Sequence, residues 1–289
     1  MQKGKKKKAI VKEQSQKPPG LESKMEPHPA YANFTPGSGK LQNKKCIITG
    51  GDSGIGRAVA IAFAKEGADV AIVYLEAEEK DAEFTASVIR KEHERKCILI
   101  QADLALPRQC RKAVEKAINK LGGLDVLVNN AGVQFPEKKI EDITEENLLE
   151  TFSVNIFAMF WVVKAALPHM RRGGAIINTA SVTAYRGSPG LLDYSATKGA
   201  VVSFTRSLSA NLVDEGIRVN AVAPGPVWTP LIVSSMEPGE VAQFGTDSPM
   251  GRPGQPAELA PAYVFLASGD ATYISGQVIH VNGGEIVNG

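Results

Sequence analysis

The sequence has few of the residues that build disulfide frameworks or protein-bound metal sites. It contains only three cysteines, and their spacing is neither paired nor that of a zinc motif: Cys46, Cys97 and Cys110. Its four histidines are scattered without ligand spacing: His28, His93, His169 and His280. We therefore expect the thiols to be buried small hydrophobes in a reducing compartment, and we expect no metal site built by the protein.

Long apolar runs and an excess of one charge are also missing. No stretch approaches the ~20 apolar residues of a membrane-spanning helix, and the N-terminus lacks the apolar segment of a signal peptide. The 33 Lys and Arg residues nearly balance the 31 Asp and Glu residues, which leaves a net charge of +2. We therefore expect neither nucleic acid nor a membrane as a partner, and we expect a cytoplasmic location.

The first forty residues differ in composition from the rest of the chain. Lys3 and Lys5 to Lys8 form a basic run, and proline-rich segments such as KPPG and EPHPAYANFTPGSGK follow it up to Lys40. Such a segment has little apolar surface with which to offset the entropy of ordering. It predicts a flexible basic and Pro-rich tail over residues 1–39, followed by one domain over residues 40–289.

From residue 44 onward, apolar strand candidates alternate with helical patterns. The strand candidates are 46–49, 70–75, 97–101, 124–128, 175–179, 218–223 and 278–281, and the helix candidates are 57–65, 78–92, 107–120, 144–170, 192–214 and 256–267. Strands that are apolar throughout are buried on both faces, and alternation with helices produces parallel crossovers. The pattern predicts an α/β fold with a single doubly wound, mostly parallel sheet of the Rossmann type and helices on both faces.

The segment SVTAYRGSPGLLDYSATK, residues 181–198, carries a possible acid/base group. Tyr194 and Lys198 are four residues apart, so on a helix they share one face. A positive charge near a phenol favours the phenolate and lowers the pKa of the phenol toward working pH. Ser181, at a strand end, could stabilise the oxygen whose proton moves. Tyr and Lys at this spacing are also common on ordinary helix surfaces, so the pair alone does not decide the function.

A glycine-rich stretch follows the first strand candidate. It reads Thr49-Gly50-Gly51-Asp52-Ser53-Gly54-Ile55-Gly56, with the pattern T-G-x-x-x-G-x-G. Glycines permit a tight turn and a close approach of the backbone to a pyrophosphate, and the start of a helix offers free N–H groups. A plain strand-to-helix connection is the alternative, but the position of the stretch after the first strand favours phosphate binding.

Several motifs in one order resemble the short-chain dehydrogenase/reductase family in its single-domain form. They are TGGDSGIG, Asp103, the segment Asn129 to Gly132, Asn155, Ser181, Tyr194-x-x-x-Lys198 and Pro224-Gly225, and the resemblance covers residues 44–284. The long N-terminus and the segments PGPVWTP and GQPAELAP resemble a branch that contains glucose and ribitol dehydrogenase homologues and stress-associated oxidoreductases. This resemblance implies an NAD(P)-dependent enzyme that transfers a hydride between a nicotinamide cofactor and an alcohol or carbonyl substrate, namely a small ketone, aldehyde, polyol or sugar.

The resemblance also implies roles for the catalytic residues. Tyr194 is expected to exchange a proton with the substrate oxygen, and Lys198 to lower the pKa of the tyrosine and hold the nicotinamide ribose. Ser181 is expected to orient the substrate oxygen, and Asn155 to anchor a water that connects Lys198 to solvent. The alternative is a dinucleotide-binding sensor or structural protein without turnover, in which this acid/base set would have no use.

The cofactor site implied by the resemblance is larger. Asp103 is expected to accept from the adenine amino group, residues 130–132 to line the adenosine ribose, and the segment from Pro224 to pack on the nicotinamide. The full set is Gly50, Asp52, Ser53, Gly54, Ile55, Gly56, Tyr74, Leu75, Glu76, Asp103, Leu104, Asn130, Ala131, Gly132, Tyr194, Lys198, Pro224, Gly225, Val227 and Thr229.

The choice between NAD and NADP is less marked in the sequence. NAD users of this family commonly carry an acid at position 74, and NADP users a base at position 75 or 53, but this chain has Tyr74, Leu75 and Ser53. Glu76 lies near the separation from Gly56 at which an acid meets a ribose 2′-hydroxyl. The acids in this stretch would repel a 2′-phosphate. The sequence favours NAD and allows NADP.

The substrate side shows fewer signals. The resemblance implies a mobile lid after the sixth strand, and Trp228 is predicted to line the pocket together with Ser181 and Tyr194, although packing of the lid onto the body is an alternative for Trp228. The resemblance further implies a homotetramer built on the helices near 147–170 and 192–214. We expect a small-molecule substrate whose identity the sequence leaves open.

Overall fold

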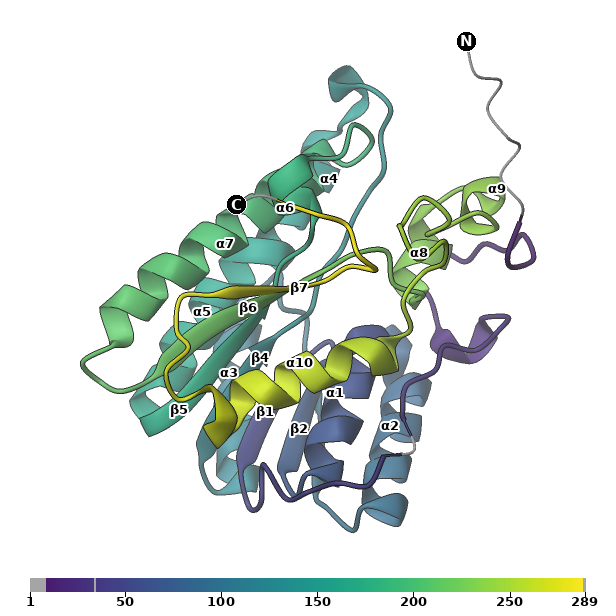
Figure 1. Ribbon diagram of the computed structural model, residues 1–289. Helices are drawn as coiled ribbons and strands as arrows, with labels where there is room; N and C mark the ends of the chain where they lie inside the picture. Colours follow the sequence, from purple (N-terminus) through teal and green to yellow (C-terminus); the bar gives the residue numbers. More distant parts are fainter. Residues whose placement is uncertain (1–8, 34, 288–289) are drawn as a thin grey trace.

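The computed structural model describes residues 9–33 and 35–287. Within these residues, seven strands form one sheet, and all neighbouring strands in it are parallel (Figure 1). The strands lie in the order β3-β2-β1-β4-β5-β6-β7. Their bounds are β1 Lys45–Thr49, β2 Asp69–Tyr74, β3 Cys97–Gln101, β4 Leu124–Asn129, β5 Met170–Thr179, β6 Arg218–Pro224 and β7 Val278–Val281. The strand order reverses between β1 and β4, as in a doubly wound sheet, so the predicted fold class is confirmed.

Helices cover both faces of the sheet (Figure 1). One face packs against α1 Gly54–Lys65, α2 Glu79–Glu92 and α10 Pro256–Ala267, and the other against α3 Pro107–Leu121, α5 Ala158–Ala166 and α7 Leu192–Leu212. Successive residues of a strand point to opposite faces, so Ile48 joins the first of these cores and Ile47 the second. Burial on both faces explains why the strands contain so few polar residues.

The predicted helix over residues 144–170 is interrupted. The structure has α4 Glu145–Phe152, a π-helical segment Ser153–Phe157, α5, and a short 3₁₀ turn Leu167–His169. Among the described residues, the stretch Glu145–His169 is long and apolar enough to cross a membrane by length and composition alone, with a mean hydropathy of 1.4 in an 18-residue window. It is not a continuous apolar run, because Glu150 and Lys164 interrupt it. Here α5 packs against α3, and the π-helical segment against α7, within the domain.

The segment between β6 and α10 contains more regular structure than its Pro and Gly content predicts. It forms two short helices, α8 Pro230–Ser235 and α9 Pro238–Val241, and a further short helix, α6 Thr183–Arg186, follows β5. We call residues 228–245 the lid segment. Its helices stand beside the carboxyl ends of the strands, next to the start of α1 (Figure 1).

The N-terminal region differs from the predicted flexible tail. Residues 9–33 form an extended arm with one 3₁₀ turn, Glu22–Lys24, which packs along the lid segment and the helices α1, α2 and α10. Met25 is fully buried, and Glu22 is only 2% exposed. The arm is ordered through a few buried anchors that its overall composition does not reveal. The lysine run at residues 3–8 lies outside the described residues.

Candidate active site

Tyr194 and Lys198 lie on α7, one turn apart, as their spacing predicts. The Lys198 Nζ atom is 5.3 Å from the centre of the Tyr194 ring. The same Nζ donates a hydrogen bond to the Thr179 carbonyl at 2.9 Å, and Lys198 is 3% exposed. The carbonyl of the last residue of β5 therefore holds the ammonium group beneath the tyrosine ring.

The pKa values of the pair differ from the expectation that Lys198 lowers the pKa of Tyr194. Burial raises the pKa of Tyr194 to about 12, and a hydrogen bond with Ser181 offsets only part of that rise. Burial also lowers the pKa of Lys198 to about 8. Desolvation disfavours both charged forms here and outweighs the attraction between them. In the protein without its ligands, Tyr194 is therefore a protonated phenol at neutral pH.

Ser181 follows β5 and turns its hydroxyl toward its own loop. Its Oγ atom accepts hydrogen bonds from the Thr183 backbone N–H at 3.2 Å and from the Thr183 hydroxyl at 3.0 Å. These two donors leave the Ser181 hydroxyl hydrogen available for another acceptor. Thr183 orients the serine, and the sequence motifs did not single it out.

Asn155 sits in the π-helical segment and is fully buried. Its side-chain oxygen accepts a hydrogen bond from the Val133 N–H at 2.8 Å, and its side-chain nitrogen donates to the Val133 carbonyl at 2.9 Å. The same nitrogen also donates to the Thr197 hydroxyl at 3.2 Å. Single π-helical turns are frequent at functional sites because they redirect one side chain. The extra residue turns Asn155 toward α7, where it lies between the strand-end loop and the Tyr/Lys pair.

A buried pair of polar residues fixes the start of α7. The Asp193 carboxylate accepts a hydrogen bond from the backbone N–H of Tyr194 at 2.8 Å and from the Thr151 hydroxyl at 2.7 Å. Asp193 is 5% exposed, so both contacts are shielded from water. Sequence reasoning missed this pair, although an acid just before the tyrosine in the first helical turn is a recognisable capping signal.

The glycine-rich turn connects β1 to α1, and Gly54 and Gly56 show why its tight backbone requires glycine. Gly54 has a φ of +51°, in the left-handed region. A Cβ on Gly56 would lie 1.8 Å from the Gly50 carbonyl oxygen. The turn therefore has room for no side chain at Gly56. At the start of α1, the Gly54 N–H donates to the Glu22 carboxylate at 2.6 Å, as an N–H at a helix start does to an acid.

A network of polar side chains ties this turn to β4 and β5. The Thr49 hydroxyl accepts from the backbone N–H of Asn130 at 2.8 Å, and the Asn130 side chain donates to the carbonyls of Thr49 and Gly50, both at 3.1 Å. The Thr179 hydroxyl bonds both Asn130, at 3.2 Å, and the Tyr263 hydroxyl, at 2.8 Å. The side-chain amide of Asn130, predicted to line the adenosine ribose, therefore has its hydrogen-bond partners within the protein. Thr49, Thr179 and Tyr263 were not predicted.

Two acids near the glycine-rich turn have raised pKa values. Asp52 is 2% exposed, and one of its carboxylate oxygens has no hydrogen-bond partner. Burial raises the pKa of Asp52 to about 6, and burial together with the charge of Asp52 raises the pKa of Glu78 to about 8. Glu76, the predicted ribose ligand, is exposed on the adjoining 3₁₀ turn, whereas Tyr74 is buried. The structure therefore brings Glu78, rather than Glu76, close to Asp52.

The remaining predicted cofactor residues lie at the carboxyl ends of the strands. The Asp103 carboxylate accepts from the backbone N–H of Ala105 at 2.9 Å. Gly225 follows β6, and its N–H donates to the Val281 carbonyl at 3.0 Å. The Thr229 side chain lies against Gly54, because a Cβ added there would be 3.1 Å from the Thr229 methyl carbon. These contacts place the ends of β3 and β6 around the same edge of the sheet as the glycine-rich turn.

The prediction that Trp228 lines the substrate pocket is wrong. The Trp228 side chain is 1% exposed and packs in a cluster with Met25, Ile232, Val233 and Val241. Its indole N–H donates to the Pro27 carbonyl at 2.9 Å. The arm covers the ring, which no local pattern predicts, so the alternative of lid packing holds for this residue.

Comparison with known proteins agrees with this geometry. Residues 50–285 match a family model described as enoyl-(acyl carrier protein) reductase. The chain is 53% identical to glucose and ribitol dehydrogenase of Daucus carota, over 96% of this chain and 97% of that protein, and 53% identical to general stress protein 39 of Bacillus subtilis, over 93% and 94%. It is 47% identical to the chloroplastic NADPH-dependent aldehyde reductase 1 of Arabidopsis thaliana, over 97% and 99%.

Solved structures show the same likeness. A short-chain dehydrogenase of Burkholderia cenocepacia in complex with NADP superposes with a TM-score of 0.79 at 33% identity, over 85% of this chain and 98% of that one. A 3-ketoacyl-(acyl-carrier-protein) reductase of Brucella melitensis in complex with NADH gives a TM-score of 0.76 at 35% identity, over 84% and 98%. The chain belongs to the short-chain dehydrogenase/reductase family, as its motifs predict.

Proposed function

We propose that this chain is an NAD(P)-dependent oxidoreductase in which Asn155, Ser181, Tyr194 and Lys198 form the catalytic set. The observation that carries the proposal is the Tyr/Lys pair on α7, in which the buried Lys198 ammonium is held by the Thr179 carbonyl beside the half-buried Tyr194 ring, and Ser181 is hydrogen-bonded to the phenol. A buried ammonium that has no carboxylate partner among the described residues, placed beside a phenol that solvent can reach, is typical of an acid/base site. Family membership supports the same reading.

The residues at the strand ends fit a nicotinamide dinucleotide. The glycine-rich turn precedes the start of α1, where a helix offers N–H groups to a pyrophosphate, and Asp52 carries a buried carboxylate oxygen without a partner that a ribose hydroxyl could satisfy. When bound, the cofactor supplies or accepts the hydride. The chain would hold it through Gly50 to Gly56 and through the residues predicted at the ends of β3, β4 and β6.

In carbonyl reduction, the chain's own residues handle the proton. The carbonyl carbon gains the hydride and its electron pair, and the carbonyl oxygen takes the hydroxyl proton of Tyr194. Ser181 donates a hydrogen bond to the same oxygen as negative charge develops on it. Lys198 stabilises the phenolate that remains, and alcohol oxidation runs the same steps in reverse.

A panel of small ketones, aldehydes, polyols and sugars tests this function. We expect turnover of at least one class, followed through the absorbance of the reduced nicotinamide, with a lower KM for NADH than for NADPH. The preference follows from Asp52, which is mostly ionised above its pKa of about 6 and would repel a 2′-phosphate, and from the absence of Arg or Lys at positions 53, 74 and 75. Similar solved structures contain NADP in one case and NADH in another. A large preference for NADPH would therefore overturn the choice of NAD but not the assignment as an oxidoreductase. Failure of the whole panel would favour a sensor without turnover.

The rate of carbonyl reduction should depend on the charge of Lys198. Because its pKa is about 8, we expect kcat for reduction at saturating cofactor to fall about tenfold between pH 7 and pH 9, as the ammonium loses its proton and no longer stabilises the phenolate of Tyr194. A Lys198→Arg variant keeps its charge in this range, so its residual activity should lack that fall. The same pH profile in the variant would assign the titration to another group.

We infer that the protein assembles as a homotetramer. Apolar side chains of α4, the π-helical segment and α5 remain exposed in the single chain, namely Leu148, Leu149, Phe157, Phe160 and Trp161. Together with neighbouring residues of α7 they form a patch that would be covered by a second copy. A molar mass in solution equal to that of one chain would contradict this assignment.

We also infer a cytoplasmic location and a small-molecule substrate. Cys46, Cys97 and Cys110 are free and buried, and burial raises the pKa of each thiol. Such thiols stay reduced and inert in a reducing compartment. Fractionation of cells that express the chain tests the location.

A further inference from the structure

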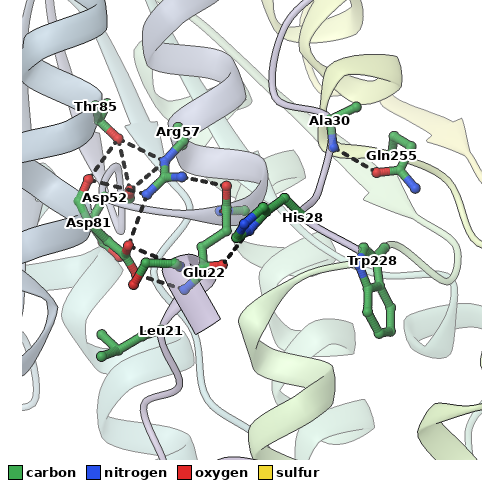
Figure 2. Close-up of polar contacts among 12 residues, drawn as sticks. Leu21, Glu22, His28, Ala30, Asp52, Arg57, Asp81, Thr85, Trp228 and Gln255 are labelled. Carbon is green, nitrogen blue, oxygen red and sulfur yellow. Dashed lines mark hydrogen bonds and ion pairs between the residues drawn. The ribbon is translucent and has the colours of Figure 1, made fainter. Parts of the chain in front are cut away.

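The N-terminal arm connects two parts of the active site that are far apart in the sequence. At one end, the backbone N–H of Ile10 donates to the Ala242 carbonyl at 2.8 Å, and that of Gln16 donates to the Val233 carbonyl at 2.8 Å. Met25 fills the core of the lid segment, beside Trp228. Further along, the arm reaches α10, where the Gln255 side chain accepts from the backbone N–H of Ala30 at 2.9 Å (Figure 2).

Between these anchors, Glu22 reaches into the glycine-rich turn. One of its carboxylate oxygens accepts from the backbone N–H of Gly54 at 2.6 Å, and the other accepts from the Arg57 guanidinium (Figure 2). Glu22 is 2% exposed and Arg57 3% exposed. Both oxygens accept from N–H groups, as those of an ionised carboxylate do. Burial raises the pKa of Glu22 to about 7, while Arg57 and the Gly54 N–H limit that rise.

Arg57 links Glu22 to a second backbone group of the turn, the Asp52 carbonyl. Its Nε atom donates to the Asp52 carbonyl at 2.8 Å and to the Thr85 hydroxyl at 2.9 Å. Its remaining nitrogen faces Asp81, whose carboxylate in turn accepts from the backbone N–H of Glu22 at 2.7 Å. The backbone groups on either side of Ser53 are therefore held by one buried ion pair, half of which belongs to the arm.

The same turn touches the start of the lid segment. Gly54, whose N–H is bound by Glu22, lies against the Thr229 side chain and near Pro230. The arm also packs on the lid directly, since a Cβ at Gly20 would lie 2.9 Å from the Pro230 carbonyl oxygen. The arm and the direct Gly54–Thr229 contact thus form two parallel links between the turn and the lid.

We propose that Glu22 is a positioning residue for the glycine-rich turn, and that the arm transmits the state of this turn to the lid segment. The inference rests on the proposed assignment of the turn to the cofactor pyrophosphate. Glu22 acts through the Gly54 N–H and through Arg57, and it fixes the turn in the conformation that receives the dinucleotide. Binding of the dinucleotide in turn stabilises the arm and the lid that it contacts, because stabilisation between linked sites is reciprocal.

Titration of the intact protein with NADH, followed by fluorescence, tests the positioning role. We expect Glu22→Ala to raise the dissociation constant about tenfold, because loss of a charged hydrogen-bond partner loosens the turn. The KM for NADH should rise by a similar factor, while kcat at saturating NADH and substrate changes by less than about threefold. Glu22→Gln keeps an acceptor for Gly54 but loses the charge opposite Arg57, so its effect should lie between those of wild type and Glu22→Ala.

Glu26→Gln is the matched control on the same arm, because the Glu26 side chain is 77% exposed and its only ion pair, among the described residues, is the long one with Lys12. Its NADH affinity should equal that of wild type. If Glu22→Ala and Glu22→Gln lower the melting temperature but bind NADH as the control does, Glu22 is merely structural and the inference fails. Should Glu22→Ala not fold, the Glu22→Gln comparison decides the outcome alone.

Amide hydrogen exchange tests the link to the lid. In wild type, NADH should slow exchange in residues 228–245, and this slowing should be reduced at least about twofold in Glu22→Gln at saturating NADH. Equal slowing in both proteins would overturn the link while leaving the positioning role in place. A wild-type protein that binds neither NADH nor NADPH would instead refute the proposed function, and the two failures are thus distinct.

Discussion

Replacing Tyr194 with Phe should lower kcat by about 10²- to 10⁴-fold for every substrate, while the dissociation constant for NADH stays within about twofold of wild type. The substitution removes only the hydroxyl group that gives and takes the proton. The ring remains between Ser181 and Lys198, so the cofactor should still find its site. Steady-state turnover and a fluorescence titration of the same preparation measure the two quantities.

Tyr185→Phe is the matched control for this substitution. Tyr185 lies on α6, a short distance along the chain from Ser181, and packs edge-on against His280. We expect this variant to retain nearly full activity. If Tyr194→Phe kept more than about a tenth of the wild-type kcat, another group would have to supply the proton, and the proposed catalytic set would be wrong.

Replacing Gly56 with Ala should abolish cofactor binding, with a dissociation constant raised about 100-fold or more. The new Cβ would lie 1.8 Å from the Gly50 carbonyl oxygen and 2.7 Å from the Asn130 side-chain nitrogen, so the turn must move. Overpacking of this kind typically costs about 1–3 kcal/mol, and here the opposing atom is backbone that cannot rotate away. NADH titration measures the loss, and thermal unfolding should show a lower melting temperature.

The control for the turn is Gly269→Ala. No atom lies within 4 Å of the Cβ that it would create, and its position is remote from the turn in sequence. Binding and melting temperature should both stay near the wild-type values. Unchanged NADH affinity in Gly56→Ala would show that the dinucleotide does not lie on this turn.

The regular elements of the domain were predictable from local pattern. Strands such as Cys97–Gln101 and Val278–Val281 have the predicted bounds, because a short run rich in apolar and β-branched residues between turn signals is a local property of the sequence. The start of α7 was predicted at Leu192 for a similar reason, since helical periodicity is a short-range property. The interruption in the 144–170 helix was not predictable, because a π-helical turn has no composition of its own.

The pKa values of the catalytic pair also needed the structure. Spacing alone places Tyr194 and Lys198 on one face and predicts attraction between their charged forms. Whether attraction or desolvation prevails depends on how much protein surrounds the pair, and here burial raises the tyrosine pKa and lowers that of the lysine. That burial depends on how the end of β5 and the Ser181 loop fold back onto α7, which the spacing of the two residues does not determine.

The sequence by itself determined the family, the doubly wound sheet and the identity of the proposed proton-handling residues, because these follow from short motifs and local periodicity. Only the tertiary structure decided where residues 9–33 lie. Glu22, Met25 and Pro27 belong to a segment whose composition predicts a tail, yet they meet Arg57, the lid core and Trp228 across the fold. Contacts between segments so distant in the chain produce no periodic pattern in the sequence. Each contact depends on where the rest of the domain places the second of the two residues.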